Sequence, residues 1–354
     1  MVEAHAEVGA SEAEALRSAT DPALGAPGPP PRYLAAGNPG VVVAAAIDAV
    51  RAGRPAVLAL VLETEGSTYS RAGAMALFDG THHAGWLSGG CLEPELARRA
   101  AVAGSQRRLD WIEIDTRDDA HLFSGGALGC RGRLRIALLP LAALPGIERL
   151  LAAWLDGGAC LQVSLAAGGG ARVQAGAHSR EWELAAAPVA WDAAGPSWSL
   201  SLAPPPEVLL LGAGPETQML LGLMHELGWR TTVVEQGERW GEACSRAHAR
   251  HDHVDIPLRD AGRFAAALAM HHNFERDRDA LAALSASSIP FVGLLGPRRR
   301  REDLVKLLAP GERRALAGRL YGPVGLALGG QGPEAIALSI AAQLQQWRAR
   351  TGVA

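Results

Sequence analysis

The stretch EVLLLGAGPETQMLLGLMHELGWRTTVVE, residues 207–235, decides the fold of this chain. An apolar run, 208–211, meets a Gly-x-Gly turn at Gly212 and Gly214. A helical pattern and a second apolar run follow, and the second run ends in Glu235. This order predicts one strand, one helix and one strand of a Rossmann-type nucleotide-binding fold.

The glycine turn of this stretch carries an incomplete dinucleotide fingerprint. Gly212 and Gly214 would let the backbone turn tightly and approach a diphosphate, to which the helix N-terminus would offer unpaired N–H groups. Glu235 would take a ribose hydroxyl. The third glycine, which permits close packing of helix on strand, is replaced by Thr217. The pattern therefore predicts the fold, and whether a dinucleotide binds stays open at this point.

Length and composition exclude several classes of protein. A chain of 354 residues is long enough for two or three domains, and its net charge of −3 gives no general basis for binding nucleic acid or an anionic membrane. It lacks both an apolar run of about 20 residues and a basic, then apolar, secretory leader. We therefore expect a cytoplasmic protein with no nucleic-acid or membrane partner.

Composition and periodicity divide the chain into four parts. Residues 1–36, rich in alanine and proline without an apolar period, are expected to form a disordered tail. An N-terminal α/β domain over 37–140 and a small β-rich segment over 141–203 follow. Three prolines at 204–206 form a stiff linker to a Rossmann-like domain over 207–348.

A polar loop is expected at the exit of the first buried strand. The pattern predicts a helix that Asn38 caps and that continues to about Ala52, and then a strand over 57–62. The loop 63–73 follows and contains Glu65 and Ser67. Loops at strand ends often carry binding groups, and a solvated connection is the alternative.

A glycine turn then presents a cysteine. A hairpin over 74–87 leads to Ser88-Gly89-Gly90-Cys91, directly ahead of a helix that Glu93-Pro94 opens. The partial positive charge at a helix N-terminus favours thiolate over thiol, and the two glycines leave the backbone accessible. Cys91 is therefore a candidate functional residue, the alternative being a buried structural thiol.

A second glycine-rich loop in the same domain also ends in a cysteine. Residues 124–132 read SGGALGCRG, with Gly129-Cys130 near the end, and lie between strands expected over 108–114 and 133–139. Two such loops in one small domain predict two sides of one site. The chain has two further cysteines and no Cys-x-x-Cys spacing, so free thiols are expected. Of these, Cys160 is expected in a core and Cys244 within a helix.

Two further strand exits in the Rossmann-like domain carry polar groups. His271-His272 follows an apolar run over 265–270. Gly296-Pro297-Arg298 follows a strand expected over 290–295 and begins a run of four arginines at a helix start. Helix dipole and guanidinium charge both favour an anion there, so Arg298 is a candidate phosphate contact, with a solvated basic run as the alternative. The cluster His248, His251 and His253 is expected to be a solvated loop rather than a metal site.

Taken together, these motifs resemble the XdhC/CoxI family, accessory factors that mature molybdenum hydroxylases such as xanthine dehydrogenase. The matching stretches run in the family's order over roughly 38–345 and are Thr64-Glu65-Gly66-Ser67, Ser88-Gly89-Gly90-Cys91, Leu128-Gly129-Cys130, Gly212-Ala213-Gly214-Pro215, Gly293-Leu294-Leu295-Gly296-Pro297-Arg298, Gly322-Pro323-Val324-Gly325-Leu326 and Pro333-Glu334-Ala335-Ile336-Ala337.

The resemblance implies a non-catalytic chaperone that binds the molybdenum cofactor. It would keep the cofactor intact while a cysteine desulfurase installs the sulfido ligand, and would then hand it to an apo molybdenum hydroxylase of the xanthine dehydrogenase type. Cys91 is the implied leading contact to molybdenum or its dithiolene surroundings, and Cys130 is the second. A thiolate suits such a soft, sulfur-rich environment. The other implied cofactor-binding residues are Glu65, Ser67, Gly89, Gly90, Gly129, Gly212, Gly214, Glu235, His272 and Arg298.

The chain departs from the family pattern in its Rossmann-like half. Met270-His271-His272 stands where the family usually has Met-Thr-His, Ala327 replaces an aspartate, and Glu235 replaces the commoner aspartate. Two alternatives stay open. One is an NAD(P)-dependent oxidoreductase using the Gly-x-Gly turn, and the other is a thiol-redox or metal protein built on the cysteines and the histidine cluster. A homodimer also stays open.

Overall fold

The computed structural model describes residues 32–34, 38–80, 82–117, 131–191 and 197–352, and the structural statements that follow concern these residues. The expected tail, 1–36, lies outside them except for a short strand, β1, at Arg32–Leu34.

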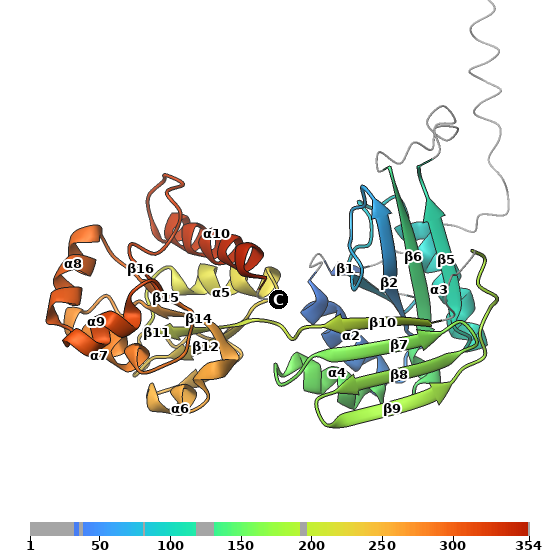
Figure 1. Cartoon of the computed structure of the whole chain (residues 1–354), viewed down its shortest axis with the longest axis horizontal. Helices are drawn as coiled ribbons and strands as arrows, with labels where there is room; N and C mark the ends of the chain where they lie inside the picture. The colour runs from blue at the N-terminus through green and yellow to red at the C-terminus, as the bar shows by residue number, and fades with distance from the viewer. Residues whose placement is uncertain (1–31, 35–37, 81, 118–130, 192–196, 353–354) are drawn as a thin grey trace, which may run out of the picture. The chain divides into compact units, whose positions relative to one another are not determined.

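The N-terminal part is built on a six-stranded sheet with helices on both faces (Figure 1). Helix α2 (Pro39–Arg51) packs on one face and helix α3 (Glu93–Gln106) on the other, each with its own cluster of buried side chains. Because both faces are covered, the central strand is apolar without alternation over residues 57–62. The sheet order is β1-β4-β3-β2-β6-β5, with β2 at Val57–Gly66, β3 at Met75–Phe78, β4 at His82–Ala84, β5 at Asp110–Asp115 and β6 at Gly132–Pro140.

The pairings of β2 to β6 with one another are antiparallel. The expected helix start at Asn38 is confirmed, because the Asn38 side chain accepts a hydrogen bond from the Val41 N–H. The expected hairpin after residue 74 is also confirmed as β3 and β4. The expected end of the strand at residue 62 is wrong. β2 continues through Gly66, so Glu65 lies within the strand and not in a loop, because residues 63–66 pair with β6 as far as Gly132.

A second, four-stranded antiparallel sheet shares the core of the first. Its order is β10-β7-β8-β9, with β7 at Leu161–Ala166, β8 at Gly170–Ala175, β9 at His178–Glu183 and β10 at Ser197–Leu202. Helix α4 (Ile147–Leu155) and this sheet contribute to the same cluster of buried side chains as α2. Within this cluster, the rings of three tryptophans pack against one another, edge to face or tilted: Trp111, Trp191 and Trp198. The prediction that Cys160 lies in a core is wrong, because it directly precedes β7 and is exposed.

The C-terminal part is a doubly wound parallel sheet. The order β13-β12-β11-β14-β15-β16 places the first strand at the centre, and the chain winds outward in both directions from it. The strands are β11 (Glu207–Leu211), β12 (Arg230–Val234), β13 (Ala249–His251), β14 (Phe264–Ala269), β15 (Phe291–Leu294) and β16 (Leu320–Tyr321). All five pairings are parallel. The Rossmann-type fold expected from residues 207–235 is therefore confirmed.

Helices cover both faces of this sheet (Figure 1). Helices α5 (Thr217–Glu226) and α10 (Pro333–Thr351) pack with one cluster of buried side chains, and α7 (Phe274–Ser285), α8 (Arg298–Leu307) and α9 (Pro310–Leu316) with another. A single turn, α6, spans Asp255–Leu258. Cys244 is buried, and the prediction that it lies within a helix is wrong, because residues 239–246 form turns. Within the described ranges, no helix has the length and apolar character that crossing a bilayer requires.

Candidate functional site

Cys91 stands exposed on a glycine turn directly ahead of α3. Gly90 has a φ of +105°, in the region that L side chains rarely adopt, so the turn needs glycine there. Apart from the adjoining residues, no atom of the described residues would lie within 4 Å of a Cβ at Gly89 or Gly90, so these residues leave the backbone of the turn open. Cys91 is therefore not the buried structural thiol that was the alternative, and its functional role stays a prediction.

A buried carboxylate fixes the shape of the turn. Glu93 accepts hydrogen bonds from the backbone N–H groups of Leu87 (3.1 Å) and Ser88 (2.9 Å), and from the Ser88 hydroxyl. The Ser88 oxygen in turn accepts from the N–H groups of Gly90 (3.1 Å) and Leu92 (3.0 Å). Burial of Glu93 opposes its ionisation, but these hydrogen bonds outweigh it and lower the pKa of the carboxyl. The ionised Glu93 carboxylate therefore fixes the backbone of the turn.

The first polar loop lies beside the flanks of both cysteine loops. The Ser70 hydroxyl donates to the Leu87 carbonyl (2.9 Å), just ahead of the Cys91 turn. The Ser67 N–H donates to the Arg131 carbonyl (3.0 Å), just after the second loop. A Cβ at Gly66 would lie 2.6 Å from that same carbonyl oxygen, so glycine is required for the two backbones to meet. Gly129 and Cys130 lie outside the described residues, and a site shared with Cys91 stays a prediction.

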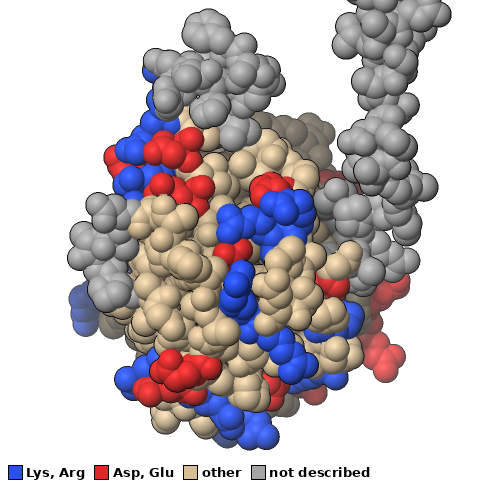
Figure 2. Space-filling model, turned by 90° about the vertical axis from the view of Figure 1, so that its right-hand side faces the viewer, with Lys and Arg blue, Asp and Glu red and all other residues tan. Residues whose placement is uncertain are grey.

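Glu65 belongs to a ladder of ion pairs that crosses β2, β6 and β5. It pairs with Arg117 (2.5 Å) and with Arg133. Arg117 also hydrogen-bonds Asp115 and lowers the pKa of that exposed carboxyl to about 2. Figure 2 shows acidic and basic side chains next to one another on one face of the molecule. The guanidinium groups around Glu65 thus already have carboxylate partners.

In the Rossmann part, the glycine turn after β11 is packed against the chain itself. A Cβ at Gly212 would lie 2.5 Å from the Cα of His271, and one at Gly214 would collide with the His272 ring and with Glu216. The two glycines therefore make room for the segment that follows β14. Their expected role in admitting a diphosphate stays a prediction.

Each of these histidines is bonded to a buried carboxylate. His272 Nε2 lies 2.9 Å from Glu216 Oε1, and His271 Nδ1 lies 3.1 Å from Asp277 Oδ1. Asp277 also accepts from the His271 backbone N–H (3.0 Å) and from Arg300 (2.7 Å). Burial opposes ionisation of Asp277, but these donors outweigh it and lower the pKa of its carboxyl. Sequence reasoning singled out His272 but missed Glu216 and Asp277, which are ordinary helix-start residues by pattern.

The other two candidates follow two parallel strands, β12 and β15, which are separated in the sheet by β11 and β14. Glu235 directly follows β12 and is buried. Arg298 is the first residue of α8, its side chain is 84% exposed, and its nearest acid is Glu302 at 3.9 Å. Arg300, in the same basic run, is instead committed to Asp277. Arg298 is thus exposed, as both a phosphate contact and a solvated basic run would be, and its role as a phosphate contact stays a prediction.

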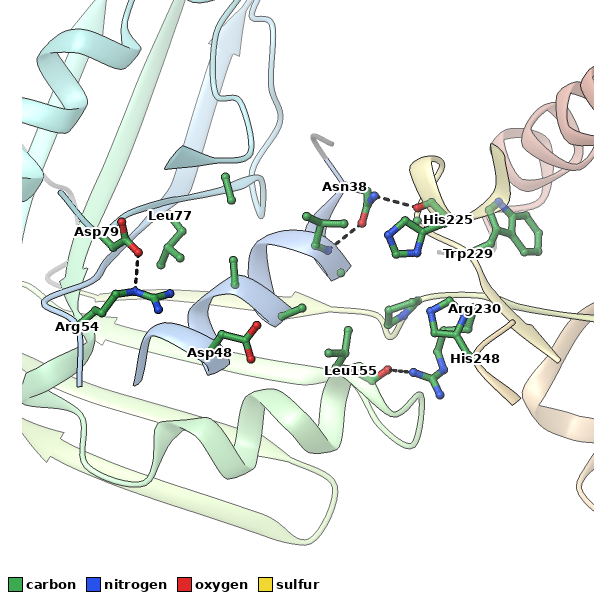
Figure 3. A pocket seen from close by; sticks show the side chains of 17 residues that line it. Asn38, Asp48, Arg54, Leu77, Asp79, Leu155, His225, Trp229, Arg230 and His248 are labelled. Atoms are coloured by element: carbon green, nitrogen blue, oxygen red, sulfur yellow. Dashed lines mark hydrogen bonds and ion pairs between the residues drawn. The ribbon is translucent and has the colours of Figure 1, made fainter. Parts of the chain in front are cut away.

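A pocket of about 450 Å³, a volume typical of small-molecule sites, lies away from all of these residues. Its lining includes Asp48 of α2, Asn38, which caps α2, and His225, Arg230 and His248 (Figure 3). Sequence reasoning did not find it, because its walls come from distant segments that share no motif. The His225 and His248 rings stack at 5.9 Å.

The histidine cluster after β12 is partly structural. His248 Nδ1 accepts a hydrogen bond from the Thr231 N–H (3.1 Å), and burial, with Arg230 and His225 nearby, lowers its pKa. Across the described part of the chain, no group of three or more His, Cys, Asp or Glu side chains is placed to hold a metal ion.

Comparison with known proteins agrees with this architecture. Residues 208–344 match the model described as the XdhC Rossmann domain, and residues 49–111 match the model of the XdhC and CoxI family. A protein of Bacillus subtilis (strain 168), named as a probable subunit of xanthine dehydrogenase, is 26% identical over 321 residues, which are 84% of this chain and 94% of that protein.

A solved structure extends the likeness to three dimensions. A crystal structure described as a xanthine dehydrogenase from Bacillus halodurans superposes with a TM-score of 0.71 at 25% identity. The match covers 87% of this chain and 96% of that one. The two family models together span more than half of the sequence, one on each side of the proline linker. The chain therefore belongs to the XdhC and CoxI family.

Proposed function

We propose that this protein is a cytoplasmic chaperone that binds the molybdenum cofactor, protects it during sulfuration and delivers it to a molybdenum hydroxylase. The observation that carries the proposal is the Cys91 thiol, exposed on a turn whose two glycines leave its surroundings open. Thiolate sulfur is a ligand for soft, sulfur-rich metal centres, which fits the donor chemistry of a molybdenum dithiolene.

The rigidity of the turn supports a binding role. Ser88 and Glu93 fix it through five hydrogen bonds, so the thiol is positioned before any ligand arrives. The open Gly89-Gly90 backbone leaves room for a bulky group beside the sulfur. When bound, the cofactor would supply the molybdenum chemistry, and the chain would hold and shield it.

Family membership supports the choice of partners. The Bacillus subtilis relative is named for xanthine dehydrogenase, and from this we propose a molybdenum hydroxylase of that type as the client. The family resemblance further supports a cysteine desulfurase that supplies the sulfido ligand. Arg298, exposed at the start of α8, is the proposed contact to the cofactor's phosphate.

The NAD(P)-dependent alternative gains no support from the glycine turn. The Gly214 N–H, which would face a diphosphate, already donates to Thr217 (2.8 Å), and the His272 ring lies over the same glycine. The turn therefore does not favour an oxidoreductase activity.

Cofactor binding by single-cysteine variants tests the proposal. Wild-type protein, Cys91→Ala and Cys160→Ala would each be incubated anaerobically with molybdenum cofactor, desalted, and measured for molybdenum and for oxidised pterin fluorescence. Cys160 is the matched control, because its thiol is also exposed but precedes a different sheet. We expect Cys91→Ala to retain at least tenfold less cofactor than the other two. Equal retention by all three proteins, or none by the wild type, would refute the proposed role.

A further inference from the structure

The region where doubly wound parallel sheets have their ligand crevice carries acidic side chains in this protein. In this fold, ligands bind beyond the carboxyl ends of the strands at the point where the strand order reverses, here between β11 and β14. The groups that the structure places there are the Gly212–Gly214 turn, Glu235 after β12, and His271-His272 after β14. The way these groups are bonded indicates which ligand the crevice accepts.

The position of a diphosphate is already filled by the chain. The N–H of Gly214, which would donate to phosphate, donates instead to Thr217 Oγ1. Glu216, whose side chain is only 2% exposed, stands at the start of α5, where the helix dipole favours an anion. The protein has placed its own carboxylate where a dinucleotide places a phosphate.

The crevice holds a second buried carboxylate. Glu235 is 8% exposed, and its side chain makes no hydrogen bond or ion pair with any described residue. In dinucleotide-binding proteins an acid at this place accepts the ribose hydroxyls. Two carboxylates therefore lie at this end of the sheet, and they would repel a phosphate while accepting O–H donors and cations.

The His272 ring is hydrogen-bonded to Glu216, and a ligand could displace it. It has a φ of +54°, uncommon for a residue other than glycine, and its side chain is 46% exposed. Its only side-chain hydrogen bond among the described residues is the one to Glu216. Rotation of this ring into solvent would uncover the Glu216 carboxylate without breaking any other described side-chain bond.

We propose that this crevice binds a nucleoside with a neutral or positively charged 5′ group, whose ribose lies on Glu235 and whose 5′ group replaces His272 on Glu216. Dinucleotides and nucleoside phosphates are excluded by the same carboxylate. The proposal concerns a site separate from Cys91 and does not depend on molybdenum cofactor binding.

Three probes that differ only in 5′ charge test the proposal. Calorimetric titrations at pH 7.5 would use adenosine, 5′-amino-5′-deoxyadenosine and adenosine 5′-monophosphate. We expect the ammonium compound to bind at least tenfold more tightly than adenosine, because a charge-assisted hydrogen bond replaces a neutral one, and the monophosphate to bind most weakly. Binding of the monophosphate as tight as that of the ammonium compound, or binding of none of the three, overturns the proposal.

Matched variants assign the effect to residues. Glu216→Gln should reduce the preference for the ammonium compound over adenosine by about tenfold, whereas Glu235→Gln should weaken both to a similar extent. Glu181→Gln, which removes an exposed carboxylate from β9, should change neither affinity. Thermal unfolding of each variant shows whether it is folded. If folded Glu216→Gln still prefers the ammonium compound over adenosine to the same extent, the Glu216 carboxylate does not contact the 5′ group.

Discussion

The backbone N–H of Gly214 donates a 2.8 Å hydrogen bond to Oγ1 of Thr217, the residue that stands in place of the third fingerprint glycine. The Thr217 N–H donates back to the Gly214 carbonyl at 3.1 Å, and the threonine is fully buried. The threonine therefore satisfies a donor that a ligand would otherwise have to satisfy. Thr217 therefore changes which groups the turn can bind, and it does not disturb the packing of α5 on β11.

Restoring the glycine should destabilise the protein. Thr217→Gly removes a buried hydrogen bond and a buried methyl group and adds backbone freedom at the start of α5, so we expect a loss of about 2–3 kcal/mol in the free energy of unfolding. Thr217→Ser keeps the hydroxyl and should lose only about 1 kcal/mol. Urea unfolding measures both. Equal losses in the two variants would mean that the hydroxyl contributes nothing.

The sequence predicted the Rossmann part well because its signals are local. Apolar runs, the glycine turn and the helix start at the arginine run, where α8 begins with Arg298, each depend on a few neighbouring residues. The end of β2 was misplaced, because pairing of Glu63 to Gly66 with β6 depends on residues 132–135, which are distant in the chain. Cys160 was misjudged for a related reason, since strand periodicity does not tell where the strand begins.

The candidate sites were predicted only in part. Cys91 and His272 could be found because unusual residue types stand beside glycines or at strand exits. Their carboxylate partners could not, because a glutamate near a helix N-terminus, such as Glu93 or Glu216, is ordinary in sequence and acquires its role only through burial.

Neutralising the carboxylate beneath the Cys91 turn should loosen it. Glu93→Gln replaces an anion that accepts three hydrogen bonds by an amide that cannot accept them all, and we expect a loss of about 2 kcal/mol in unfolding free energy. Glu95→Gln, on the same helix but exposed, should leave the unfolding free energy nearly unchanged. Chemical denaturation compares the two, and similar values would show that the network carries no stability.

Protonation of His248 should destabilise the protein in mild acid. Burial, with Arg230 and His225 nearby, lowers the pKa of His248 below 6.5 in the folded state. Below pH 6.5 the unfolded chain therefore binds the proton more readily, so the contribution of His248 to stability falls as pH falls from about 7.5 through 6.5. His248→Asn keeps an acceptor for the Thr231 N–H but cannot titrate. Unfolding free energies at pH 7.5 and 5.5 should differ less in this variant than in the wild type, and an equal difference would contradict the assignment.

Two arginines of one basic run should behave differently. Arg300 is the charged partner of Asp277, whose side chain is 1% exposed, so Arg300→Gln should lose about 2–3 kcal/mol by leaving a buried carboxylate poorly paired. Arg298→Gln should change the unfolding free energy by less than about 0.5 kcal/mol, because its 3.9 Å ion pair with Glu302 is exposed. Thermal and urea unfolding distinguish them. A large loss in Arg298→Gln would mean that its guanidinium is committed to the fold and is not available to an anion.

The Asn38 side chain caps two helices, and a substitution that introduces a charge tests both contacts. Asn38 Oδ1 accepts from the Val41 N–H (3.0 Å) at the start of α2, while Nδ2 donates to the carbonyls of His225 and Glu226 (3.1 Å each) at the end of α5. Asp and Ser are both good N-caps for α2. Asn38→Asp, however, would place a carboxylate oxygen against two carbonyls at the negative end of α5.

We therefore expect Asn38→Asp to lose about 2 kcal/mol in unfolding free energy and Asn38→Ser about 1 kcal/mol, because only the aspartate introduces repulsion at the α5 terminus. The difference should shrink at pH 3, where a protonated aspartate can donate to one carbonyl. If Asn38→Asp is as stable as wild type at pH 7, Asn38 caps α2 alone, and the contact with α5 contributes nothing to the stability of the folded chain.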